Sequence, residues 1–521
     1  MKIDKIPFTA AKFFSPLFLD YCSRAEILNP FIQHWPDADA FDEQIALRKE
    51  KPVDREVLYQ SLIRQYGSME IPAEVRRNLE QLREPDCFTV VTGHQLNIFT
   101  GPLYFIYKIV TCINAAKALS MSNPGKHIVP VYWMASEDHD SEEIDHFRLF
   151  GKTYRWQHGQ QGPVGRFDTA ALADLLNSLP EPLPLFEKAY RDHSDLATAT
   201  RYIVNELFGR EGLVIIDGDD KLLKARFTGV MADDLISHST RNKVDESNAA
   251  LAQHGYKAQV FAREINLFYM EPGIRERIVE TDGGFELATS KHRTWTRERL
   301  LAELEEHPEH FSPNVVLRPL YQESILPNLA YVGGPAEIAY WLQLKSTFDH
   351  YKLPFPVLLP RNFALIVSGM LAAKLDRLLL QPADLFEGFN LAKAKMLRTA
   401  GVAETDLSEE MVQLKKLFLS IQEKAEVVDS SLTGFIAAER ARVEKILENI
   451  AKRIVKAEEQ KQETGIRQLE TIVNRLFPDG GLQERTDNFL NFYINDQSFI
   501  AALLECFDPF DFRFNILIGD V

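Results

Sequence analysis

The chain has 521 residues, with 59 Lys and Arg against 75 Asp and Glu, which gives a formal net charge of −16. Hydrophobic residues make up 45% and charged residues 26%, as in an ordinary globular protein, which excludes a disordered or fibrous chain. The acidic balance disfavours general nucleic-acid binding. No apolar run approaches the roughly 20 residues of a membrane span, so we expect a cytoplasmic protein with no membrane partner.

The cysteines are scattered along the chain and form no CxxC pair; they are Cys22, Cys87, Cys112 and Cys506. This usage is typical of free thiols in a reducing compartment. It indicates neither a disulfide framework nor a structural zinc site, and we predict no metal site.

The first half of the chain predicts strands that alternate with helices. A β-branched run at 87–92 precedes apolar residues at helical spacing over 101–119, and a second apolar run covers 128–134. A strand, a long crossover and another strand indicate a βαβ unit with parallel strands. A third run lies at 213–216. The runs are continuously hydrophobic, which favours a parallel sheet with helices on both faces.

Later segments extend this sheet. We predict strands at 314–318 and 356–359, and a helix within 331–348 that opens with a Gly pair. Before them, short strand-like pieces separated by turn residues predict a small antiparallel insertion at about 240–305. The pieces are 258–262, 266–270, 275–279 and 283–288. The expected first unit is an α/β core over residues 1–365.

A helical unit is expected over residues 366–521. Apolar residues recur seven apart at Ile436, Val443, Ile450 and Ala457, with charges between them. This heptad pattern predicts a long helix in a coiled coil. The aromatic tail over 482–521 would leave a large apolar patch in water, so we predict that it packs on the core.

Polar residues follow the first predicted strand, where ligands bind in an open parallel sheet if strand order reverses nearby. They are Thr92, Gly93, His94, Gln95, Asn97, Thr100 and Gly101. Gly93 permits a tight exit from the strand, and His94 and Asn97 are placed to donate hydrogen bonds to a phosphate at the next helix N-terminus. The alternative is a surface turn in which Thr100 caps the helix.

The second strand runs into a charged segment, Glu137-Asp138-His139-Asp140. Carboxylates beside an imidazole suit general-base work, ammonium binding or divalent metal binding. The alternative is an acidic helix start. A zinc site is disfavoured because no Cys or second His stands at ligand spacing.

The third candidate segment holds Gly333, Gly334 and Glu337, with Arg361 after a late strand. The Gly pair is suited to cradle an anion, Glu337 to hold an amine, and Arg361 to neutralise a phosphate or carboxylate. The alternatives are plain turn chemistry for the glycines and a surface ion pair for Arg361.

The chain resembles the bacillithiol biosynthesis family of cysteine-adding ligases, which act on glucosaminyl malate. The likeness covers nearly the whole chain and rests on four strings in order: TGHQLNIFTGPLYFIYKI, VPVYWMASEDHD, FSPNVVLRPLYQESILPNLAYVGGPAEIAYWLQLK and PFPVLLPR. It implies a Rossmann-like core with inserted connecting segments and a coiled-coil domain that pairs two subunits as a homodimer.

The resemblance also implies a distant likeness to class I aminoacyl-tRNA synthetases and to the mycothiol cysteine ligase. There, a His-containing loop after the first strand contacts ATP phosphates, and the segment 92–97 occupies the matching place. Many family members carry Gln at the position of His94. The superfamily's Lys-rich loop has no clear counterpart, and Pro360-Arg361-Asn362 stands roughly where it would be.

The resulting hypothesis is amide formation between the carboxyl group of cysteine and the amine of glucosaminyl malate, with ATP as the expected activating co-substrate. His94, Asn97 and the helix start near Gly101 would stabilise phosphate charge. Asp138 or His139 would act as base.

Substrate groups would be held by the remaining candidates. Glu137 or Asp140 would bind the ammonium group of cysteine, and Arg361 or the Gly333–Gly334 pair would bind the malate carboxylates. Two other functions stay open: a tRNA-synthetase-like nucleotide-binding protein acting on another amino acid, and a non-catalytic coiled-coil adaptor.

Overall fold

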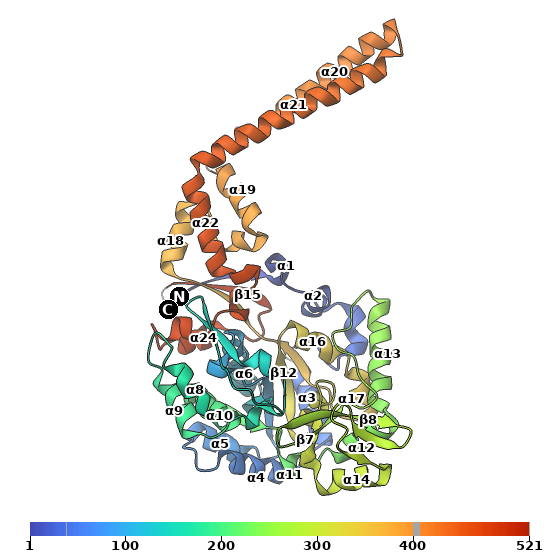
Figure 1. The fold of residues 1–521 in the computed structure, drawn as a ribbon, viewed down its shortest axis with the longest axis vertical. Helices are drawn as coiled ribbons and strands as arrows, with labels where there is room; N and C mark the ends of the chain where they lie inside the picture. The colour runs from blue at the N-terminus through green and yellow to red at the C-terminus, as the bar shows by residue number, and fades with distance from the viewer. Residues whose placement is uncertain (38, 400–406, 520–521) are drawn as a thin grey trace.

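A five-stranded parallel sheet forms the centre of the N-terminal part of the molecule (Figure 1). The computed structural model describes residues 1–37, 39–399 and 407–519. The strand order is β13-β12-β2-β3-β6, with every pairing parallel. The strands are β2 (Cys87–His94), β3 (His127–Met134), β6 (Val214–Asp217), β12 (Asn328–Gly333) and β13 (Val357–Pro360). Strand order therefore reverses between β2 and β12.

Both faces of this sheet are buried. On β2, every residue is buried, and Phe88 and Val90 join an apolar cluster with α3 (Ala40–Glu50) and α6 (Tyr104–Ser122). Val91 points to the other face and joins the larger cluster. The alternation follows from the two-residue period of a strand. The predicted α/β core with a covered parallel sheet is confirmed.

The predicted strand at 314–318 is wrong. The Asn314 side-chain oxygen accepts hydrogen bonds from the backbone N–H groups of Val316 (2.8 Å) and Leu317 (3.2 Å), which turns the chain into α15 (Arg318–Ile325). Such a turn competes with a strand even where the residues are β-branched. The fourth strand of the sheet is β12, and the predicted helix within 331–348 is divided into α16 (Pro335–Leu342) and α17 (Lys345–Tyr351).

A separate antiparallel sheet has the order β10-β9-β8-β7-β11; four of its strands lie in the region predicted as an insertion, and β11 lies just beyond it. No strand forms at 258–262, because the Gln343 side chain accepts the N–H groups of Gln259 (2.8 Å) and Val260 (3.1 Å). The strands are β7 (Leu267–Glu271), β8 (Ile274–Thr281), β9 (Gly284–Leu287), β10 (Thr294–Trp295) and β11 (Phe311–Pro313).

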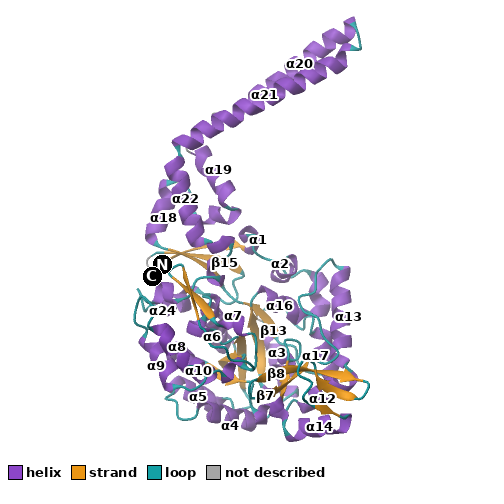
Figure 2. Cartoon of the chain, viewed as in Figure 1, coloured by secondary structure: helices purple, strands orange, loops and turns teal. Residues whose placement is uncertain are grey.

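The two ends of the chain meet in a third sheet (Figure 2). The last strand, β15 (Arg513–Ile518), pairs antiparallel with β1 (Lys2–Pro7) and parallel with β14 (Phe363–Val367). Buried Glu484 strengthens the connection, because its carboxylate accepts the backbone N–H of Ala364 at 3.1 Å. The C-terminal tail thus packs on the core.

A long helical hairpin projects from this body (Figure 1). It consists of α20 (Ser408–Val428) and α21 (Leu432–Lys461), and α22 (Glu463–Leu476) returns the chain to the body. The predicted coiled-coil domain is confirmed. Its heptad row is only partly covered, since Ile436 is buried but Ile450 is 43% exposed.

The remaining helices and one hairpin complete the body. None of the described helices combines the length and apolar character needed to cross a bilayer. The elements are α1 (Phe8–Ala11), α2 (Pro16–Cys22), α4 (Arg55–Tyr66), α5 (Ala73–Gln81), α7 (Ser141–Ile144), β4 (His146–Leu149), β5 (Lys152–Arg155), α8 (Ala170–Leu176), α9 (Pro184–Asp192), α10 (Leu196–Phe208), α11 (Lys221–Lys224), α12 (Thr228–Ser237), α13 (Ser239–Gln253), α14 (Arg297–Glu306), α18 (Gly369–Arg377), α19 (Phe389–Thr399), α23 (Leu490–Tyr493) and α24 (Phe499–Cys506).

Candidate functional site

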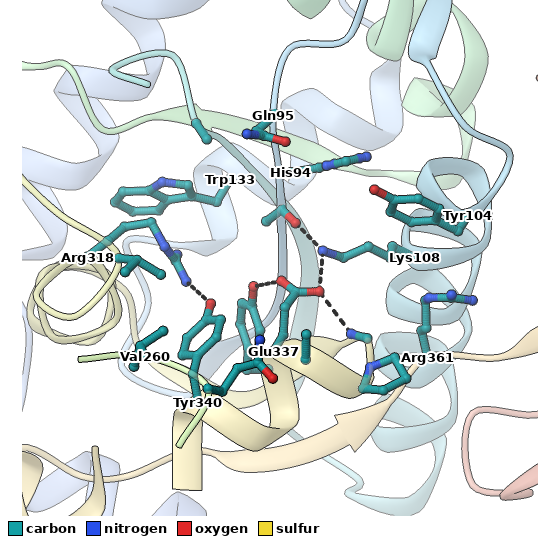
Figure 3. A pocket seen from close by; sticks show the side chains of 18 of the residues that line it. His94, Gln95, Tyr104, Lys108, Trp133, Val260, Arg318, Glu337, Tyr340 and Arg361 are labelled. Carbon is teal, nitrogen blue, oxygen red and sulfur yellow. Dashed lines mark hydrogen bonds and ion pairs between the residues drawn. The ribbon is translucent and has the colours of Figure 1, made fainter. Parts of the chain in front are cut away.

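A pocket of about 480 Å³ opens where strand order reverses, between the carboxyl ends of β2 and β12 (Figure 3). We call it the switch-point pocket. Ligands of open parallel sheets bind at this place because the connections leave a crevice there. Six of the residues predicted from the sequence line it: Gly93, His94, Gln95, Gly334, Glu337 and Arg361.

The floor of the pocket is a buried ion pair. The Lys108 ammonium lies 2.7 Å from Glu337 Oε2 and donates to the carbonyl oxygen of Gly93. Glu337 also accepts hydrogen bonds from the Tyr331 hydroxyl (2.6 Å) and the Gly334 N–H (2.8 Å). The Glu337 carboxylate, which was predicted to bind a substrate amine, is therefore already occupied by the protein's own Lys108. The pair fixes the ends of β2 and β12 to each other.

Each member of this pair favours the charged form of the other. Burial raises the pKa of Glu337, but Lys108 and the hydrogen bond from Gly334 outweigh it and hold the pKa below its usual value. Burial lowers the pKa of Lys108, and Glu337 opposes that shift. A carboxylate held this way is a weak proton acceptor, so we regard Glu337 as a structural member of the pocket.

His94 presents a neutral imidazole to the pocket. Its ring lies 5.2 Å from the Tyr104 ring and 5.1 Å from the Phe105 ring, measured between centroids. Burial first, and then the charge of Lys108, lower the pKa of His94 to about 3. Its buried Nε2 has no hydrogen-bond partner among the described residues. The ring is therefore ready to make one hydrogen bond to a ligand without adding positive charge.

Cations dominate the wall of the pocket. The charged lining residues are Lys108, Arg318, Arg361 and Arg485 against Glu143 and Glu337. Arg318 donates to the Tyr340 hydroxyl at 3.2 Å, and no carboxylate lies within ion-pair distance of it in the described part of the chain. Arg361 instead forms a buried pair with Glu484. The excess of positive charge favours an anionic ligand.

Four predicted residues of the first loop shape it without lining the pocket. The Thr92 hydroxyl donates to the Val332 carbonyl at 2.9 Å, and the Asn97 amide donates to the Glu143 carbonyl at 2.9 Å. Thr100 is buried and does not line the pocket. Gly101 has φ +62°, and a Cβ there would lie 2.5 Å from Asn97 Cβ.

The start of α6 is closed to a ligand. The Leu103 N–H donates to the Asp487 carbonyl at 2.7 Å, and the Asn488 amide donates to the carbonyls of Phe99 (2.8 Å) and Gly101 (2.7 Å). The C-terminal tail thus covers the helix end that the sequence suggested for phosphate binding. Gly333 ends β12 beside the pocket, next to Gly334.

Asp138 reaches the switch-point pocket through Gln95. The Gln95 amide donates to Asp138 Oδ2 at 2.9 Å and also to Glu143, and Gln95 and Glu143 both line the pocket. Burial raises the pKa of Asp138, but hydrogen bonds from His139 and Gln95 and the charge of Arg275 outweigh it. The pKa lies well below the usual range, which makes Asp138 a poor general base.

The other charged residues of that segment lie outside the pocket. Glu137 pairs with the fully buried Lys224 at 2.5 Å. His139 is exposed and its Nδ1 lies 2.7 Å from an Arg275 nitrogen, and Asp140 is exposed. The acidic segment therefore divides: only Asp138 is coupled to the pocket, through one amide.

Sequence reasoning missed several lining residues: Tyr104, Lys108, Trp133, Arg318, Tyr331, Tyr340 and Arg485. A signal existed for Lys108, which is the only charged residue between 101 and 116. A lysine within an otherwise uncharged stretch of a helix in a buried βαβ unit is rarely there without a partner. Among the described residues, one group brings three metal-ligating side chains together, at His307, Glu309 and His310, and none of them lines this pocket.

Comparison with known proteins agrees with the fold. The family model described as "Bacillithiol biosynthesis BshC, N-terminal Rossmann-like domain" matches residues 1–362, and "Bacillithiol biosynthesis BshC, C-terminal coiled-coil domain" matches residues 364–518. These matches confirm the Rossmann-like class of the first unit.

Similar proteins from several bacteria carry the name "Putative cysteine ligase BshC". The Flavobacterium johnsoniae protein is 40% identical over 532 residues, covering 99% of this chain and 100% of its own. The Christiangramia forsetii protein is 38% identical over 535 residues, with 99% of both chains covered, and the Cytophaga hutchinsonii protein is 38% identical over 512 residues, with 98% of both covered. These names agree with the predicted ligase enzyme. The chain belongs to the bacillithiol biosynthesis BshC family.

Proposed function

We propose that the protein joins the carboxyl group of cysteine to the sugar amine of glucosaminyl malate, with ATP as the activating co-substrate. The observation that carries the proposal is the switch-point pocket. It combines an excess of cations, a buried Lys108–Glu337 pair and a neutral His94 with an unpartnered nitrogen. Such a pocket suits a bound polyphosphate whose charge rises during the reaction.

The chemistry explains why ATP is needed. A carboxylate does not acylate an amine at neutral pH, so one carboxylate oxygen of cysteine attacks a phosphorus of ATP; attack at the α-phosphorus expels pyrophosphate, and attack at the γ-phosphorus expels ADP. The sugar amine then attacks the activated carbonyl carbon, and AMP or phosphate, respectively, leaves with the carboxylate oxygen. Arg318 and Arg485 line the pocket and can neutralise phosphate oxygens, while His94 supplies one neutral hydrogen bond.

The amine loses a proton when it attacks. We assign the proton acceptor to Glu143 in preference to Asp138 or His139, because the Glu143 side chain lines the pocket while those two do not. Gln95 bridges Glu143 and Asp138, which positions the Glu143 carboxylate. Glu137 and Asp140 stay candidates for the cysteine ammonium only if the segment rearranges when substrate binds.

We also propose that the helical hairpin pairs two copies of the chain as a homodimer. Apolar side chains on both helices face solvent, including Leu417 (57% exposed), Phe435 (63%) and Ile446 (56%). A second hairpin would cover them. Light scattering of the purified protein should give twice the chain mass, and Leu417→Glu with Phe435→Glu should reduce it to one chain mass.

The reaction is tested with cysteine labelled with ¹⁸O in its carboxyl group. The pure protein is incubated with labelled cysteine and glucosaminyl malate, with and without ATP. We expect the joined thiol only with ATP, and one ¹⁸O atom in the released AMP or phosphate. No joined product, or product without nucleotide cleavage, would overturn the proposal. The adaptor alternative expects neither product nor nucleotide binding.

A further inference from the structure

A second pocket of about 430 Å³ opens at the same edge of the sheet, at the carboxyl ends of β3 and β6. We call it the β6 pocket. Ser136, which follows β3, lines it, while the preceding residue, Ala135, lines the switch-point pocket. The first turn of α10 contributes Ala197 and Thr198, and Arg201 follows one turn later on the same helix. Adjacent residues of one loop, Ala135 and Ser136, thus line two different pockets.

The β6 pocket contains a buried arginine with unused hydrogen-bonding capacity. Arg201 is 3% exposed; its Nη2 donates to Gln65 at 3.2 Å, and its Nη1 has no partner among the described residues. No carboxylate among the described residues lies within 4.0 Å of the Arg201 guanidinium. Two other buried arginines differ, since Arg48 pairs with Glu323 and Arg361 pairs with Glu484. A desolvated guanidinium without an anion is costly, so Arg201 points to an anionic ligand.

The acidic residues of the β6 pocket do not cancel this charge. Asp219 is already shared by Arg166 (2.7 Å) and Lys224 (3.3 Å). Asp217 accepts hydrogen bonds from Ser136 and from the Asp219 N–H (2.9 Å), and burial, followed by the charge of Asp219, raises its pKa to about 6. Its carboxyl group is therefore mostly ionised near neutral pH, and it repels an anion less only below about pH 6.

The remaining carboxylate of the β6 pocket caps its helix. Asp195 accepts the Thr198 N–H at 2.8 Å at the N-terminus of α10, a helix of 13 residues. That N-terminus carries a positive potential, which the capping Asp195 carboxylate partly offsets. Arg166, with a side chain that is 42% exposed, lines the pocket; a ligand would draw its guanidinium away from Asp219, which would keep Lys224 as its partner. Two anion-binding groups, one buried and one adjustable, fit a molecule with two negative ends.

We propose that the β6 pocket binds a small dicarboxylate, and that in the reaction it holds the malate end of the acceptor while the amine reaches the switch-point pocket. The second part of this assignment rests on the proposed function. Arg361, the residue that the sequence suggested for this task, is occupied by Glu484. The planar fork of Arg201 matches a carboxylate with two parallel hydrogen bonds.

The test measures binding of L-malate alone to the full chain by calorimetry, with pyrophosphate as the competing probe. Arg201→Gln should weaken malate binding at least tenfold. Ala197→Glu should do the same by placing a negative charge in the pocket, and it should fold because Glu is favourable in a first helical turn. Arg191→Gln, on the exposed surface of the neighbouring α9, should bind malate as the unaltered protein does.

Each outcome decides the proposal. The proposal is overturned if malate does not bind the unaltered protein, or if Arg201→Gln and Ala197→Glu bind malate as tightly as the unaltered protein does. It is also overturned if pyrophosphate binds more tightly than malate and this binding depends on Arg201. In the joining reaction, Arg201→Gln should raise the KM for glucosaminyl malate at least tenfold and leave kcat within about threefold. If malate binds as expected but no product forms, the proposed function fails and the β6 pocket stands.

Discussion

Replacing Glu337 by Gln should destabilise the protein, because it leaves the Lys108 ammonium buried without a carboxylate. The two charges are 2.7 Å apart. At an effective dielectric constant of about 20, their attraction is about 6 kcal/mol, and the cost of removing them from water offsets much of it. Losing one partner of a buried pair costs about 3–5 kcal/mol. Since the Glu337 side chain is 23% exposed, we expect about 3 kcal/mol.

Lys108→Met should cost less, about 1–2 kcal/mol, because Glu337 keeps its hydrogen bonds from Tyr331 and Gly334. In the double variant Lys108→Met/Glu337→Gln neither charge is left alone, so its loss should fall short of the sum of the single losses by about 2 kcal/mol. Urea unfolding followed by tryptophan fluorescence is a suitable assay, since Trp133 and Trp341 lie in the core. Losses that add within about 0.5 kcal/mol would refute the proposed coupling.

Three further predictions concern single positions. His94→Ala should lower kcat about 10- to 100-fold while His94→Gln keeps most activity, since only a neutral hydrogen bond is needed; equal losses in a product assay would contradict this. The Asp217 pKa of about 6 lies above its unfolded value, so stability should fall as pH rises from about 4 to 6; Asp217→Asn should flatten that slope in melts across this range, and an unchanged slope would count against it. Gly101→Ala should cost more than about 1 kcal/mol in urea melts, because a positive φ and a contact with Asn97 both oppose a Cβ; an unaffected midpoint would contradict the strain.

The parallel core was predictable because its signal is local. Continuous apolar runs such as that of β2 identify strands buried on both faces, and the loops after them must then lie at one edge. His94, Gln95 and Gly334 were located by that rule. The strand expected at 314–318 failed because one side chain, Asn314, redirects two β-branched residues into a turn.

The rest of the site depends on contacts between distant parts of the chain. Arg361 is neutralised by Glu484, which lies 123 positions later, and the N-terminus of α6 is covered by Asp487. Neither contact leaves a trace in the local pattern. Lys108 is different, because a single charge within the uncharged stretch 101–116 was visible and only its partner was not. Arg201 on α10 and Asp217 at the end of β6 likewise come to line one pocket only in the folded chain.

Two lysines of α6 decide whether the joining reaction takes place in the switch-point pocket. Lys108 is buried in the pocket, while Lys117 is exposed and pairs with Glu211 on the surface. Formation of the joined thiol is measured by mass spectrometry for Lys108→Met and for Lys117→Met, each checked for folding by circular dichroism. We predict a loss of at least 100-fold for Lys108→Met and an unchanged rate for Lys117→Met. An unchanged rate for folded Lys108→Met would contradict the assignment of the reaction to this pocket.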